Sequence, residues 1–145
     1  MILTHTEAGL ALDAISSELT RLERPAVIAV ADDHGELIAL LRMDGAPLPS
    51  ILNATNKAWT AARERKPSFD IGRAVRHIET GFDIAYFGDR RYIGWGGGMP
   101  VVFGGIVIGA IGVSGAPEAV DMEMAALGVA AIIGARTERS AKAIT

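Results

Sequence analysis

Two pairs of apolar segments, each joined by a short turn, constrain the fold of this 145-residue sequence most strongly. Residues 26–31 and 36–43 are separated by a polar turn that ends in Gly35, and residues 99–103 and 106–113 are separated by two glycines. Apolar runs around such turns are typical of β-hairpins, whose strands run antiparallel. The sequence therefore predicts two hairpins within one antiparallel sheet.

Helical periodicity surrounds these hairpins. A capping box of Thr4 and Glu7 precedes apolar residues spaced three and four apart, which predicts a helix of about 18 residues. Pro25 is expected to end that helix, because proline disfavours helical torsions in the residue before it. Ser50 is predicted to be the N-cap of a second helix, which Pro67 stops.

Two further helices and a weak strand complete the predicted order. Ser68 is expected to cap a short third helix that Gly81 ends, and a final helix is expected to start near Pro117. Residues 91–95 are interpreted as a short additional strand. The resulting prediction is one α+β domain over residues 1–145, with a five-stranded antiparallel sheet packed against helices.

Composition narrows the function classes. The chain has no cysteine, which excludes disulfides, thiolate metal sites and cysteine nucleophiles. Its 14 basic and 17 acidic residues give a net charge of −3, so no basic surplus indicates a nucleic-acid partner. The longest apolar stretch, residues 99–113, is too short for a membrane span, and the N-terminus lacks the features of a signal peptide. We expect a cytoplasmic protein with no membrane partner.

Small side chains indicate self-association. Half of the residues are apolar, 17 are glycine and only 6% are aromatic. A short chain with this composition has more apolar surface than one protomer can bury, which favours a homo-oligomer.

Several segments that occur in one order carry a resemblance to a known family. They are Arg-Met-Asp-Gly-Ala at residues 42–46, Lys-Ala-Trp-Thr-Ala-Ala at residues 57–62, Gly-Gly-Met-Pro-Val at residues 97–101, Ile-Gly-Ala-Ile-Gly-Val-Ser-Gly at residues 108–115, and a following helix with Asp121 and Glu123. Together they resemble the GlcG/HbpS family, which includes the C-terminal domain of PduO-type proteins. The likeness covers nearly the whole chain.

The resemblance implies a PAS- or profilin-like α+β fold that assembles into dimers or larger oligomers, up to octamers. It also implies haem as a cofactor, because some members bind haem and a secreted type degrades it. The sequence departs from the family at Leu41, where members often have a histidine before the Arg-Met-Asp triplet, and between residues 67 and 96.

The first candidate site is a pocket for a small anion such as a carboxylate. Gly96, Gly97 and Gly98 can turn successive backbone amides toward one concavity, because glycine adopts torsions that other residues avoid. Ser114 and Gly115 directly precede a predicted helix, whose amino end favours negative charge. Convergence of these two segments would hold a carboxylate or a haem propionate.

Two basic residues are expected to complete this pocket. Arg42 ends a predicted strand and offers two parallel donors to a carboxylate, while Lys57 adds a mobile charge. Lys57, Arg42 and Asp121 are the candidate catalytic residues, with Lys57 or Asp121 as the general acid–base group. The alternative is that the glycines only form a turn, that Ser114 only caps a helix, and that Arg42 pairs with Asp44 or Asp121.

The candidate haem ligand is His77. Arg73 and Arg76 flank it, and two guanidiniums beside an imidazole would suit a porphyrin with two propionates. The alternative is an exposed basic helix. His5 and His34 are expected at the surface, and no histidine spacing predicts a non-haem metal site.

Three functions therefore stay open at this point. The first is a small-ligand-binding protein that binds or degrades haem. The second is a cofactor-free tautomerase, decarboxylase or hydrolase that acts on an organic or aromatic carboxylic acid. The third is a non-catalytic, oligomeric accessory protein.

Overall fold

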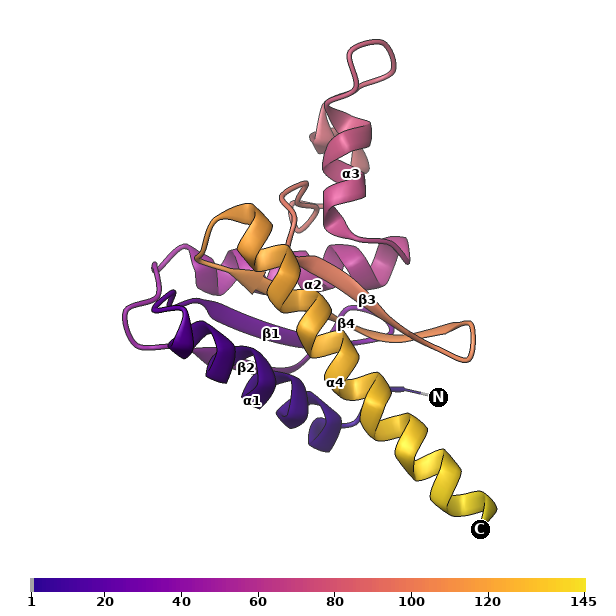
Figure 1. Ribbon diagram of the computed structural model, residues 1–145. Coiled ribbons are helices and arrows are strands. Elements are labelled where there is room, and N and C mark those ends of the chain that lie inside the picture. Colours follow the sequence, from indigo (N-terminus) through magenta and orange to yellow (C-terminus); the bar gives the residue numbers. More distant parts are fainter. Residues whose placement is uncertain (1) are drawn as a thin grey trace.

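The protein is a four-stranded antiparallel sheet between two layers of helices (Figure 1). The computed structural model describes residues 2–145. The strand order is β2–β1–β4–β3, so each hairpin supplies one inner and one edge strand. The elements in chain order are α1 (His5–Arg21), β1 (Val27–Asp32), β2 (Leu37–Arg42), α2 (Ser50–Glu64), α3 (Ser68–Val75), the 3₁₀ helix η1 (Ile84–Phe87), β3 (Gly98–Phe103), β4 (Ile106–Ser114) and α4 (Glu118–Ile144).

Helices cover both faces of the inner strands, which explains why β1 is apolar from residue 27 to residue 31. Ile28 and Val30 pack in the core under α1 and α4, whereas Val27 and Ala29 pack against α2. Figure 1 shows the same arrangement, with α1 and α4 side by side on one face and α2 on the other. A strand that is buried on both faces has no reason to alternate apolar with polar residues.

Close contact between α2 and the sheet depends on small residues. Ala54 and Ala58 of α2 are fully buried against β1 and β4. A Cβ atom on Gly112 of β4 would overlap the carbonyl oxygen of Ala54 and lie 2.6 Å from the amide nitrogen of Ala58. The position therefore has space only for glycine, and this packing fixes the distance between α2 and the sheet.

Both hairpins and the first helix cap are confirmed. Gly104 and Gly105 turn β3 into β4 with positive φ angles of 58° and 77°. Glu7 donates its amide to the Thr4 hydroxyl at 3.2 Å, and the Thr4 amide donates to the Glu7 carboxylate at 2.9 Å. Turn chemistry and capping are local, so both could be identified without knowledge of the tertiary structure.

The predicted fifth strand is wrong. Residues 91–95 form a loop in which the Thr60 hydroxyl of α2 donates to the Arg91 carbonyl at 3.1 Å and accepts from the Ile93 amide at 3.2 Å. These backbone groups are thus satisfied by a helix side chain instead of a neighbouring strand. Two helix limits also differ, because Pro49 rather than Ser50 is the N-cap of α2, and α3 ends at Val75.

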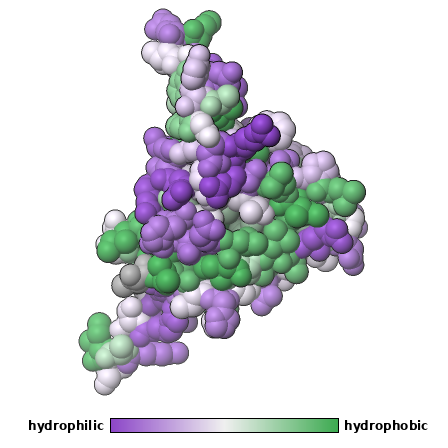
Figure 2. Space-filling view, turned by 180° about the vertical axis from the view of Figure 1, so that it is seen from behind, coloured by the Kyte–Doolittle hydropathy of each residue, from purple (hydrophilic) through white to green (hydrophobic). Residues whose placement is uncertain are grey.

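Apolar side chains remain exposed on the helix α2 side. Figure 2 shows them gathered in a band across the face turned away from α1 and α4. Leu37 in the edge strand β2, and Leu48 and Leu52 around the start of α2, are among the exposed large apolar residues. The homo-oligomer expected from composition stays a prediction, and this band is a surface that it could cover.

Candidate functional site

A polar cavity of about 380 Å³ lies where α2, the loop before β3 and the β4–α4 connection meet. Helix α2 contributes three residues spaced three and four apart, which places them on one helix face. The residues that line the cavity are Ser50, Asn53, Lys57, Trp95, Gly96, Ser114, Gly115, Ala116, Glu118 and Asp121. The cavity thus brings together most of the predicted anion pocket.

Lys57 and Asp121 form a buried ion pair in this cavity, with 2% and 3% of their surfaces exposed. The Lys57 Nζ atom donates to the Asp121 Oδ2 atom at 3.2 Å and to the Val113 carbonyl at 2.9 Å. The pair therefore joins α2, β4 and α4 at one point. Sequence reasoning named both residues, and the structure places them in direct contact.

Burial shifts both members of the pair toward their neutral forms. It lowers the pKa of the Lys57 ammonium, and the charges of Asp121 and Glu118 only partly oppose this shift. Burial likewise raises the pKa of the Asp121 carboxyl, against the effect of Lys57 and of backbone amides. Moving a proton from the ammonium to the carboxylate therefore costs less free energy here than it would in water. The pair is suited to proton transfer for this reason.

Carboxylates already occupy the amides that an anion pocket would need. The Ala116 amide donates to Asp121 Oδ1 at 3.1 Å, and the Gly96 amide donates to Glu118 Oε2 at 2.8 Å. The lining contains one lysine and two carboxylates, so the net charge of the cavity is negative. This charge disfavours a carboxylate ligand, so the expected preference for anions needs correction.

The other two glycines of the triplet act as spacers behind the pair. Gly97 has a φ angle of 123°, and a Cβ atom there would lie 3.0 Å from Lys57 Nζ. A Cβ atom on Gly98 would overlap the Lys57 carbonyl and lie 2.8 Å from the Ser68 hydroxyl. Both glycines are buried, and their role is to leave room for the lysine rather than to present amides to a ligand.

Arg42 does not line this cavity, which corrects the prediction that it joins Lys57. Val27 of β1 pairs with Arg42 on one side and with Ser114 on the other, so a whole strand separates them. Arg42 instead lines a second cavity of about 670 Å³ between the C-terminal half of α1 and the end of β2. We call this second space the α1–β2 cavity.

The α1–β2 cavity combines an apolar wall with two arginine residues. Leu19, Leu41 and Met43 line it, together with Arg24 and Arg42. Within residues 2–145 the two arginine side chains have no hydrogen bond or ion pair, although the carboxylates of the neighbouring residues 23 and 44 also lie in the lining. The sequence did not indicate that either arginine lies beside this apolar wall, because the wall is formed by two segments that are distant in the chain.

The structure places His77 away from both cavities. It is exposed after the end of α3, and its Nδ1 atom accepts the amides of Glu79 and Thr80, each at 3.2 Å. Only a small hollow with Asp70 and Arg73 adjoins it. An imidazole that accepts at Nδ1 carries its proton on Nε2 and has no free nitrogen for iron. The prediction that His77 ligates haem therefore does not fit this geometry.

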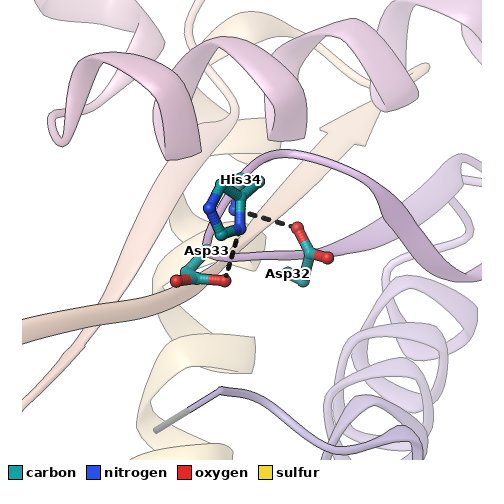
Figure 3. Close-up of side chains that lie close together, drawn as sticks. All are labelled: Asp32, Asp33 and His34. Carbon is teal, nitrogen blue, oxygen red and sulfur yellow. Dashed lines mark hydrogen bonds and ion pairs between the residues drawn. The ribbon is translucent and has the colours of Figure 1, made fainter.

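One group of side chains within residues 2–145 has the proximity of a metal site. Figure 3 shows Asp32, Asp33 and His34 in the β1–β2 turn, with the imidazole turned toward the Asp33 carboxylate. The Asp32 Oδ1 atom accepts the amides of His34 at 2.9 Å and Glu36 at 3.0 Å. These contacts close the hairpin turn, which is the role that the sequence indicated for this segment.

Comparison with known proteins identifies relatives along most of the chain. A family model described as haem degrading protein HbpS-like matches residues 3–130. Protein GlcG from Escherichia coli strain K12 is 36% identical over 115 residues, which cover 79% of this chain and 82% of GlcG. None of the helices formed by residues 2–145 combines the length and the apolar character that a membrane crossing requires.

Solved structures agree with this relationship. The crystal structure of the Klebsiella pneumoniae protein ORFY superimposes with a TM-score of 0.85 at 30% identity, covering 90% of each chain. A PduOC:heme complex superimposes with a TM-score of 0.84 at 27% identity, covering 90% of this chain and 95% of the other. The fold and the order of motifs are thus shared with proteins of which one is a complex with haem.

Proposed function

Because the chain belongs to the HbpS-like family of haem degrading proteins, we propose that it binds haem in the α1–β2 cavity. The observation that carries the proposal is the combination of about 670 Å³ of space, an apolar wall, and two arginines in the lining, Arg24 and Arg42, whose side chains have no ion pair within residues 2–145. A porphyrin requires an apolar cleft for its ring and cations for its two propionates. The haem-bound relative supports the choice of ligand.

The residues of the cavity fit haem in three respects. Leu41 would contact the ring, and Arg24 and Arg42 would bind the propionates. Met43 is the lining residue with a soft sulfur donor, and a thioether is an established axial ligand for haem iron. A bound haem would supply redox chemistry, while the chain would supply binding, orientation and partial exclusion of water.

We expect an Arg24→Ala/Arg42→Ala double variant to weaken hemin binding at least tenfold. A charged hydrogen bond contributes about 1.5–3 kcal/mol, so each lost guanidinium accounts for roughly a tenfold change or more. The measurement is a hemin titration followed at the Soret band. Met43→Leu should change the spectrum of the complex while it preserves most of the affinity, because Leu keeps the volume and removes the sulfur.

His77→Ala and Arg73→Ala are the matched controls, since both residues are exposed, His77 is the other candidate ligand and Arg73 lies in the hollow beside it. Both variants should titrate like the wild type. Loss of binding in His77→Ala, with normal binding in the double arginine variant, would move the haem to α3 and refute the proposed cavity. Absence of any saturable Soret change in the wild type would remove haem binding altogether.

A further inference from the structure

The Lys57 ammonium in the polar cavity has more hydrogen-bond donors than the protein has acceptors for them. An ammonium carries three N–H groups, and within residues 2–145 Nζ has two acceptors, the Val113 carbonyl and Asp121. Lys57 itself lines the polar cavity, together with Gly96, which has no side chain. A ligand oxygen or carbon is therefore able to approach the amine from the cavity.

The cavity lining indicates the charge of that ligand. Glu118 and Asp121 outnumber the one amine, so an acid would be repelled. The other polar groups are neutral: the Asn53 amide has no partner among the described residues, and the Ser114 hydroxyl makes only a long bond of 3.4 Å to Ser50. These groups suit a small, uncharged molecule with hydroxyl or carbonyl oxygens.

We propose that Lys57 is a nucleophile that forms an imine with small neutral aldehydes or ketones bound in the polar cavity. A cavity of about 380 Å³ admits molecules of a few carbon atoms, and Trp95 and Gly96 border it. The site is separate from the α1–β2 cavity and does not depend on haem binding.

Asp121 supplies the proton transfers that imine formation needs. Nζ in its neutral form attacks the carbonyl carbon, the C=O π bond breaks, and Asp121 relays the first of the two nitrogen protons to the carbonyl oxygen to give a carbinolamine. Asp121, 3.2 Å from Nζ, accepts a proton from the nitrogen and returns it to the hydroxyl, which leaves as water while the C=N bond forms. One amine and one carbonyl thus give one imine and one water.

The surroundings favour the reactive form of the amine. Burial lowers the pKa of Lys57, which increases the fraction that is neutral near pH 7. The Val113 carbonyl holds Nζ in place, so the nucleophile does not have to be oriented at the moment of reaction.

The test is reductive trapping in the wild-type protein. The protein is incubated with glycolaldehyde and cyanoborohydride at pH 7, and peptide mapping by mass spectrometry gives the rate of alkylation at each lysine. The chain has three lysines, and Lys66 and Lys142 are exposed, so they report the ordinary reactivity of an amine in the same tube. We expect Lys57 to be alkylated about tenfold faster than Lys66. Alkylation of Lys66 and Lys142 with little or none at Lys57 would overturn the proposal.

Two comparisons test the details. Glyoxylate is similar in size to glycolaldehyde but is anionic, and the ratio of Lys57 to Lys66 alkylation should fall several-fold with it; an equal ratio would refute the preference for neutral ligands. Asp121→Asn keeps the shape of the side chain and should slow alkylation of Lys57 while Lys66 is unaffected. An unchanged rate in a variant shown by circular dichroism to be folded would refute the role of Asp121.

Discussion

Replacing Glu7 with Gln is expected to lower the free energy of unfolding by about 4 kcal/mol, because it leaves a buried cation without its partner. Glu7 is 1% exposed and Arg136 is 8% exposed. The Glu7 carboxylate accepts two hydrogen bonds from the Arg136 guanidinium, at 2.7 and 2.8 Å, and a third from Arg139. Urea unfolding of wild type and variant at pH 7 measures the difference.

The contribution of Glu7 should disappear in acid. Burial alone would raise the pKa of this carboxyl, but hydrogen bonds from Arg136, the Thr4 backbone and Arg139 outweigh burial and lower the pKa to about 2. Since the folded pKa lies below the ordinary value of 4.5, the stabilisation is complete above pH 4.5 and is lost as the pH falls toward 2. The stability gap between wild type and Glu7→Gln should therefore narrow between about pH 4.5 and pH 2.

Glu18→Gln is the matched control, because Glu18 pairs with Arg21 on the same helix but at the surface. Exposed pairs contribute little, so this variant should unfold at the wild-type urea concentration. Two results would contradict this account of the buried contacts. One is an equal loss of unfolding free energy in Glu7→Gln and Glu18→Gln, and the other is a difference between wild type and Glu7→Gln that does not change with pH.

Gly112→Ala is expected to destabilise the protein by about 3 kcal/mol, near the upper end for overpacking. The added methyl group would overlap the Ala54 carbonyl and force α2 away from β4. Because α2 carries Lys57, the Lys57–Asp121 contact should loosen as well. Thermal unfolding measures the first effect, and the rate of Lys57 alkylation measures the second.

The control for this substitution is Gly9→Ala in α1, where a Cβ atom would meet nothing within 4 Å. Alanine is favoured over glycine within a helix by up to about 1 kcal/mol, so this variant should be slightly more stable than the wild type. A Gly112→Ala protein with wild-type stability would mean that α2 can shift without loss of packing.

Local patterns in the sequence predicted the hairpins and the Thr4 cap. The strand order could not be read in the same way, and the error at Arg42 follows from it. Arg42 ends β2 and Ser114 ends β4, and both are paired with Val27 of the strand between them. The ends of β2 and β4 are therefore level with each other in the sheet but are separated by β1. This arrangement depends on the strand order, which only the tertiary structure reveals.

The charge of the polar cavity was missed for a related reason. Glu118 lies in the first turn of α4, and its contact with Gly96 bridges 22 positions. Ser50, Asn53 and Lys57 do carry a signal, because polar residues at intervals of three and four lie on one face of a helix. That face could have indicated the cavity, although not the carboxylates opposite it.

The ion pair of Glu7 and Arg136 also bears on how the chain matures during synthesis. Its partners lie 129 positions apart, so the acid emerges from the ribosome long before the base that neutralises it. Until α4 is complete, α1 has no cation for its buried carboxylate, and the face of the sheet that α1 and α4 cover together is covered by α1 alone. Stable folding should thus be postponed to the last stage of translation, and nascent chains that stop before residue 136 should stay sensitive to protease.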